Sequence, residues 1–219
     1  MTSHPAPAEM LLDYATGALP EGPALVVACH LSLAPESLEL VADLEAVGGA
    51  MLAATPAAPM DDGALAAVLA RLDDADEAAA PDAAPGPLAG LPPAVRAYVP
   101  EGAAWSRVMP GVEEIALPLR DGRHNAALMR IGAGRAIPRH THEGVEYTLV
   151  ISGAFNDGER RYAAGDICVA DASLDHRPAV DGVEACVCLA VSEASIVLTG
   201  PVGRWLNPLL RRRSAKPPR

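Results

Sequence analysis

The residues with the clearest capacity for chemistry are three histidines and one glutamate in the second half of the chain. His140 and His142 lie two apart in "PRHTHEGVE", Glu146 follows four residues later, and His176 lies further along. Neutral imidazoles and a carboxylate are ligands for divalent first-row metals such as zinc, iron or manganese. Side chains two apart on a strand share a face, so His140, His142 and Glu146 are expected to point to one side of a single strand. Alternatively, these side chains only pair with one another inside the fold.

The same ligand set fits more than one role for the metal. Four protein ligands in a tetrahedron complete a zinc site, whereas iron or manganese with these ligands can keep positions open for a substrate. The residues themselves therefore leave open whether the metal stabilises, senses or catalyses. His124, which stands alone in "DGRHNAAL", is expected to be a surface or turn residue and not a further ligand.

The elements that must position these residues change character along the chain. Apolar residues at helical spacing predict helices over 8–17, 21–32, 35–51 and 62–74. After about residue 100, short β-branched runs between Gly, Asp and Pro turns predict six or more strands. The predicted fold is α+β and multidomain: a small all-α domain (1–75), an Ala-, Asp- and Pro-rich linker (76–100), an antiparallel β-barrel (101–207) and a disordered basic tail (208–219).

Charge is distributed unevenly. Residues 1–94 hold fourteen acidic residues and one arginine, Arg71, a net charge of about −13, while the whole chain carries −11. This excludes direct nucleic-acid binding, because phosphates are repelled, and it suits a basic partner or simply keeps the helices solvated. We expect a cytoplasmic protein without membrane contact, because neither a secretory leader nor a run of about 18 apolar residues is found. The four cysteines show no disulfide spacing.

The spacing of the metal-capable residues resembles a known motif. The first cupin motif, G-x5-H-x-H-x3-E-x6-G, is matched at each position, by Gly134, His140, His142, Glu146 and Gly153. The second motif, G-x5-P-x-G-x2-H-x3-N, keeps only its first and fourth positions: Gly165 and His176 match, and Asp171, Ser173 and Val180 replace Pro, Gly and Asn. The resemblance implies a cupin (jelly-roll-like) barrel in which His140, His142, Glu146 and His176 bind one divalent metal.

The first half adds a second resemblance. "HLSLAPESLELVADLEAVGGAML", preceded by "LLDYATGAL", resembles the N-terminal domain of ChrR-type anti-sigma factors, in which a helical domain precedes a cupin domain. The resemblance implies that the helices bind an extracytoplasmic-function sigma factor and that the cupin domain senses a signal, expected to be oxidative, which promotes release. It further implies that the cupin metal is zinc, that the chain is not an enzyme and that no residue is catalytic.

One part of the family pattern is replaced. The family's helical domain carries a zinc signature, H-x(about 25)-H-x3-C-x2-C, whose histidine positions are held here by His4 and His30. Its cysteine positions are held by Ala34 and Ser37. Neither can supply a thiolate, and a neutral hydroxyl is a poor zinc ligand. We therefore expect the N-terminal zinc to be absent or weakly held.

Two further groups of residues, one apolar and one of cysteines, each allow a functional and a structural interpretation. Leu65, Val68 and Leu72 are expected to fill a groove on the sigma factor, or else to pack in a core. Cys186 and Cys188 share a strand face and are either redox-active near the metal or inert buried thiols. A homodimer through the cupin domain is also expected.

Two other functions stay open on the sequence. One is a metal-dependent cupin enzyme of the dioxygenase type with a helical appendage. The other is a diverged paralogue that no longer binds a sigma factor.

Overall fold

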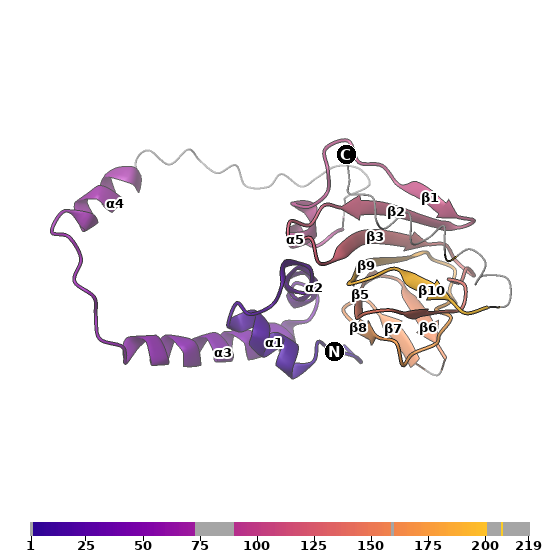
Figure 1. Ribbon diagram of the computed structural model, residues 1–219, viewed down its shortest axis with the longest axis horizontal. Coiled ribbons are helices and arrows are strands. Elements are labelled where there is room, and N and C mark those ends of the chain that lie inside the picture. The colour runs from indigo at the N-terminus through magenta and orange to yellow at the C-terminus, as the bar shows by residue number, and fades with distance from the viewer. Residues whose placement is uncertain (1, 73–89, 159, 201–206, 208–219) are drawn as a thin grey trace.

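The computed structural model describes residues 2–72, 90–158, 160–200 and 207. Helices lie in the first half and strands in the second (Figure 1). The helices are α1 (Ala8–Ala15), α2 (Glu21–Leu31), α3 (Pro35–Ala53), α4 (Ala64–Leu72) and α5 (Pro93–Arg96). The strands are β1 (Ser106–Met109), β2 (Val112–Leu117), β3 (Asn125–Ile131), β4 (His140–His142), β5 (Glu146–Ser152), β6 (Ala154–Asp157), β7 (Arg160–Ala163), β8 (Ile167–Ala170), β9 (Cys186–Ser192) and β10 (Ile196–Leu198).

The strands form antiparallel sheets, as the sequence predicts, but not one closed barrel. The described strands make a six-stranded sheet in the order β1-β2-β3-β9-β5-β8 and two ribbons, β10-β4 and β6-β7. Short connections between strands of different sheets fold the ribbons over one face of the large sheet (Figure 1). The result is a cupin-like sandwich whose interior lies between the large sheet and the ribbons.

Strand β9, in the middle of the large sheet, packs against other elements on both of its faces, which explains its unbroken apolar run "CVCLAV". Leu189 and Val191 belong to a core that includes residues of α1, α2 and α5. Cys186 and Cys188 alternate with them and pack toward Phe155 in the cupin interior. A strand covered on both faces has no solvent side and therefore loses the polar alternation of a half-buried strand.

Helix α2 packs directly on the sheet. It is apolar all round, and most of its residues are buried, including Val26 and Val27, which are fully so. At its first turn, a Cβ atom added to Gly22 would lie 2.8 Å from Cγ1 of Val191 and 2.9 Å from Cβ of His124, so only glycine allows this approach. Burying an apolar side chain such as that of Val26 or Val27 stabilises the fold by about 1.5–3 kcal/mol. The helices and the sheet therefore share one core.

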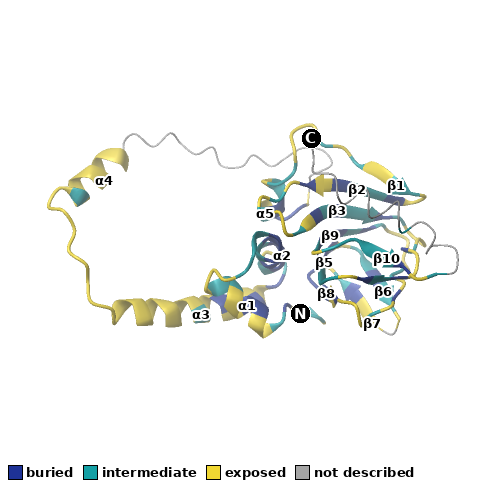
Figure 2. Ribbon diagram, in the orientation of Figure 1, coloured by how far each residue is buried: buried dark blue, intermediate teal, exposed yellow. Residues whose placement is uncertain are grey.

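Beyond α2 the helices behave differently. The apolar face of α3 is buried at Val41, but Val47 is 60% and Met51 72% exposed, so the C-terminal half of this face is open to solvent. Helix α4 has no buried residue. Figure 2 shows residues 44–72, here called the arm, as mostly exposed. Helix α3 contacts α1 and α2, and its two buried residues, Ser37 and Val41, both lie in its N-terminal half.

The helices and strands bear only in part on the predicted limits of the helical domain, linker and cupin domain. Helix α5 lies inside the predicted linker 76–100, of which residues 76–89 are outside the described residues, as is the predicted tail 208–219. We keep the limits as a prediction. Among the described residues no single helix has the length and apolar character of a membrane span. Helices α2 and α3 reach that length and apolar character only when taken together, and a bend of 119° separates them.

Candidate metal centre and partner surface

Three of the predicted ligands come together in the cupin interior. His140 and His142 lie on β4, and His176 lies in the loop after β8. The backbone fixes this arrangement, since His140 and His176 exchange both N–H···O=C bonds, at 3.0 and 2.9 Å, and β10 pairs with the other edge of β4. All three residues are buried, and one ring nitrogen of each lies within 4.8 Å of the other two.

The hydrogen bonds of the rings direct lone pairs toward one another. Nδ1 of His140 lies 2.8 Å from the carbonyl oxygen of Pro138, and Nδ1 of His176 lies 2.7 Å from Oδ2 of Asp157. Both partners are acceptors, so each Nδ1 carries a proton, and in the neutral imidazole that binds metals each Nε2 presents a lone pair. The two Nε2 atoms are nevertheless only 3.0 Å apart, and Nε2 of His142 lies equally close to Nε2 of His176. Facing lone pairs repel unless a cation lies between them.

These separations fit a metal of ordinary size. Two nitrogens that bind one tetrahedral zinc ion lie about 3.3 Å apart, close to the observed spacing. Burial lowers the pKa of His140 and of His142 to about 4, so both imidazoles are neutral near pH 7, the form that binds metals. Nδ1 of His142 is buried without a hydrogen-bond partner, a further sign that the protein atoms alone do not complete this cluster.

Glu146 lies beside the cluster but not in it. Its Oε2 is 3.7 Å from Nδ1 of His142, while its Oε1 accepts a hydrogen bond from Oγ1 of Thr148 at 3.1 Å. The prediction of one strand from His140 to Glu146 is wrong, because β4 ends at His142 and Glu146 begins β5, in another sheet. Burial raises the pKa of Glu146, which is expected for a carboxyl group without a nearby cation.

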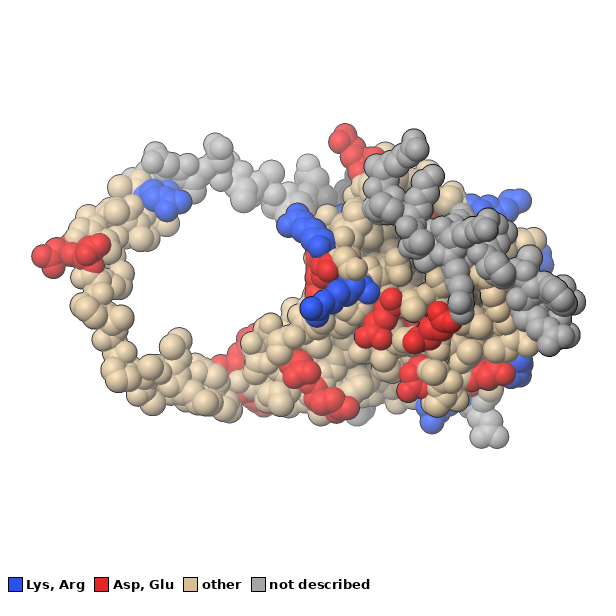
Figure 3. All heavy atoms as spheres, in the orientation of Figure 1, with Lys and Arg blue, Asp and Glu red and all other residues tan. Residues whose placement is uncertain are grey.

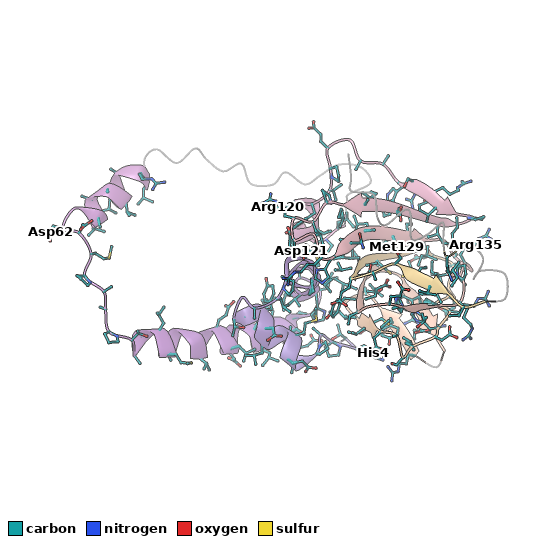
Figure 4. The ribbon with its side chains drawn as sticks, viewed as in Figure 1. His4, Asp62, Arg120, Asp121, Met129 and Arg135 are labelled. Atoms are coloured by element: carbon teal, nitrogen blue, oxygen red, sulfur yellow. The ribbon has the colours of Figure 1, made fainter. Side chains whose placement is uncertain are left out.

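An apolar cavity adjoins the histidines. His140, Glu146 and His176 provide its polar wall, and the rest is mainly apolar or sulfur-bearing, including Met129, Phe155, Cys168 and Cys188. Figure 4 labels Met129 on β3 of the large sheet. Such a site can accept a small, largely apolar molecule beside the metal position.

The two neighbouring cysteines of β9 are free and in contact. Sγ of Cys186 lies 3.5 Å from Sγ of Cys188, and both side chains are buried. The hydrogen bond between the thiols lowers the pKa of Cys186 and raises that of Cys188. By contrast, burial raises the pKa of Cys29 to about 12, as expected for an inert thiol.

Metal binding is expected to depend on Asp157, a residue that no motif in the sequence identifies. Its carboxylate orients His176 and strengthens that imidazole as a ligand. We expect Asp157→Asn to weaken metal affinity by about 10- to 100-fold. Competition with a chelator of known affinity measures this, and Asp181→Asn, a nearby carboxylate that bonds Asn156, is the control. Equal affinity in both variants would contradict the role of Asp157.

The residues of the N-terminal zinc signature do not assemble a metal site. His30 is fully buried, and its two ring nitrogens lie 2.8 Å from the carbonyl oxygen of Gly165 and 2.8 Å from Oγ of Ser37. His4, labelled in Figure 4, instead packs against Tyr162 of β7, with ring centroids 4.5 Å apart and an angle of 38° between the rings. Ala34 is buried and offers no donor. Within the described ranges, the metal-capable group is the cupin histidine cluster alone.

His124 differs in part from its prediction. It lies in the turn between β2 and β3, as expected, but its side chain is only 4% exposed. Nδ1 bonds Oδ2 of Asp121 at 2.7 Å, in a turn whose backbone N–H groups are capped by Glu21 of α2 (Asp121 and Arg120 are labelled in Figure 4). The residue thus belongs to the contact between α2 and the sheet, away from the metal ligands.

The residues predicted to contact a partner lie on the exposed arm. Leu65, Val68 and Leu72 of α4 are 67%, 57% and 65% exposed. The space-filling view shows the arm as a slender extension, mostly free of charged side chains apart from a few at the ends of its segments (Figure 3). An apolar surface of this kind on a detached helix is typical of a site that another protein covers.

Comparison with known proteins places these features in a family. The fold and the histidine cluster define a cupin domain that follows a helical part, and residues 96–195 match the ChrR cupin-like domain. The anti-sigma-E factor ChrR of Cereibacter sphaeroides is 37% identical over 205 residues, which are 92% of this chain and 95% of that protein. The chain therefore belongs to the family of ChrR anti-sigma factors.

A solved structure supports the assignment over both halves. In the crystal structure of Rhodobacter sphaeroides SigE in complex with the anti-sigma ChrR, a chain 37% identical to this one aligns with a TM-score of 0.72. The alignment covers 88% of this chain and 99% of that chain. The matched relative is an anti-sigma factor and not an enzyme, which confirms that expectation.

Proposed function

We propose that this chain is an anti-sigma factor that binds an extracytoplasmic-function sigma factor in the cytoplasm through its helices, and that its cupin domain regulates this binding. The observation that carries the proposal is the match to ChrR across nearly the whole chain, helices included. The solved ChrR relative was crystallised in complex with SigE, so a sigma factor is the partner class with direct support.

The exposed arm supports the proposal physically. The arm (residues 44–72) carries apolar side chains on both helices, with Val47, Met51 and Leu52 on α3 and Leu65, Val68, Leu69 and Leu72 on α4. Exposed acidic residues accompany them, among them Glu45, Asp61 and Asp62. Apolar contacts give affinity, while negative charge speeds the encounter with a basic, DNA-binding protein. Two helices joined by a segment without regular structure can also adjust to a partner's shape.

The cupin domain is proposed to hold one divalent metal, most simply zinc. His140, His142 and His176 would bind it, and the nearby carboxylate of Glu146 would supply the fourth ligand. Zinc with three nitrogens and one oxygen is a closed, tetrahedral site that stabilises a fold without redox chemistry of its own. The oxidisable groups would then be the sulfur atoms, with Cys188 on the cavity wall in contact with Cys186.

The experiment uses the full chain and a purified extracytoplasmic-function sigma factor from the same organism. We expect complex formation in titration calorimetry, and we expect the sigma factor to lose binding to core RNA polymerase when the chain is present. Oxidation of the metal-loaded chain with hydrogen peroxide should weaken the complex, and Cys186→Ser/Cys188→Ser should reduce that response. No binding by the folded chain would favour the diverged-paralogue alternative, and binding that ignores the oxidant would overturn the sensory half of the proposal.

A further inference from the structure

The strap, residues 2–6 at the N-terminal end of the described chain, is fixed to the cupin domain by a buried carboxylate. Asp166 is 2% exposed, and its Oδ1 accepts the N–H groups of Ser3 and His4 at 2.7 and 2.8 Å. Oδ2 accepts the N–H of Ala163 at 2.8 Å. A buried carboxylate requires such donors, and here two of the three come from the strap. The strap is therefore part of the packing of the β7–β8 turn.

The same turn is fixed to α2 and α3 through His30. Burial lowers the pKa of His30, so the ring is neutral. Nδ1–H donates to the carbonyl oxygen of Gly165, and Nε2 accepts from Oγ of Ser37 at 2.8 Å and from the N–H of Ala6 at 3.3 Å. Both ring nitrogens are thus satisfied by protein groups. One imidazole joins the strap, α2, α3 and the cupin turn.

These connections coincide with the zinc signature of the family. In the signature, positions 4, 30, 34 and 37 would join the strap, α2 and the start of α3 through one metal ion. Here Ser37 contacts His30 as a hydrogen-bond donor, where a thiolate would bind metal. Ala34 has no ligand atom and His4 faces Tyr162. The donor set does not fit zinc, yet the three segments remain joined.

The cupin turn is shaped for this contact. Gly165 has φ +90°, and a Cβ atom there would lie 2.8 Å from Cγ2 of Thr2 in the strap. The N–H of Ile167, the first residue of β8, donates to the carbonyl oxygen of His4 at 2.8 Å. Cys168, the next residue, lines the cavity beside the histidines. The turn therefore connects the cavity wall to the strap through adjacent residues.

We propose that the strap, His30, Ser37 and Asp166 form a metal-independent junction that takes the place of the family's N-terminal zinc and fixes α2 and α3 to the β7–β8 turn. The helices then keep their arrangement when zinc is withdrawn. If the chain binds a sigma factor as proposed above, release cannot begin with the loss of an N-terminal metal, and the cupin site is the one that responds.

The first experiment measures zinc per chain after exhaustive chelation and reloading with zinc sulfate. His140→Ala/His176→Ala should hold no tightly bound zinc, whereas Ala34→Cys/Ser37→Cys should gain about one further zinc ion per chain. Tightly bound zinc that persists in the cupin variant and disappears when His30→Gln is added would overturn the proposal. Failure of the cysteine variant to gain zinc would also overturn it, because the junction would then not occupy the position of the zinc site.

The second experiment follows amide hydrogen exchange of the strap in the His140→Ala/His176→Ala background. Chelator should leave the exchange of Ser3, His4 and Ala6 unchanged there. Ser37→Ala should speed the exchange of these amides about tenfold or more. Ser32→Ala should not, because the hydroxyl of Ser32 donates to the carbonyl oxygen of Cys29, outside the junction. Loss of protection on chelation, or equal protection in the two serine variants, would contradict the junction. No sigma factor is used, so failure here is distinct from failure of the proposed function.

Discussion

Two aspartates on the exposed face of α4, introduced as Leu65→Asp/Leu72→Asp, are expected to weaken binding to the sigma factor by about 100-fold or more. Central apolar contacts in protein interfaces cost about 2 kcal/mol or more when removed, and each 1.4 kcal/mol is about tenfold in affinity. A charge in an apolar groove adds the cost of its desolvation. Because α4 has no buried residue, the fold of the free chain should not be affected.

The control for this prediction lies on the same helix. Ala67→Asp/Ala70→Asp adds the same charge on the opposite side of α4, where helical geometry turns the side chains away from Leu65 and Leu72. Calorimetric titration of the three proteins separates a contact from a change in helix stability or net charge. If both variants bind like the unmodified chain, α4 is not a contact, and the apolar residues of α3 become the remaining candidates on the arm.

The sequence predicted the parts of the fold that depend on local pattern. The helices near residues 8, 21 and 35 and the strands of the second half follow from apolar periodicity, and the cupin motif identified three histidines that do meet in space. Motif spacing succeeds here because β4 is a single short strand, on which His140 and His142 necessarily share a face.

The parts that could not be predicted depend on contacts between distant segments. Periodicity showed that α3 has an apolar face but not that Val47 and Met51 lie beyond the neighbouring helix. Spacing could not show that a turn separates His142 from Glu146. Asp157 and Asp166 carry no motif, and their roles arise from hydrogen bonds to residues 19 and 163 positions away. A single sequence holds no signal for such pairs, since each aspartate looks like an ordinary turn residue.

His140→Ala is expected to lower the metal affinity of the full chain by more than about 100-fold. Loss of a ligand exceeds the effect of losing a supporting hydrogen bond, which costs about 10- to 100-fold. The metal's stabilisation of the fold should be lost as well, because a ligand that binds only the folded state at 100 times its Kd adds about 2.7 kcal/mol. Metal content after dialysis against weak chelator, together with thermal unfolding with and without added zinc, measures both effects.

Comparison with two other variants makes this result specific. His124→Ala removes a buried histidine that bonds Asp121, away from the cluster, and should leave metal content unchanged. Glu146→Ala distinguishes two possible ligand sets at this site. A large loss of metal affinity would show that the carboxylate is the fourth ligand, and a small loss would show that the three imidazoles suffice. Full occupancy in His140→Ala would mean that the converging Nε2 atoms do not bind metal. Nε2 of His176 lies 3.0 Å from Nε2 of both His140 and His142, and without a metal these distances would require a proton shared between rings. Such sharing is opposed by burial, which lowers the pKa of both His140 and His142 to about 4.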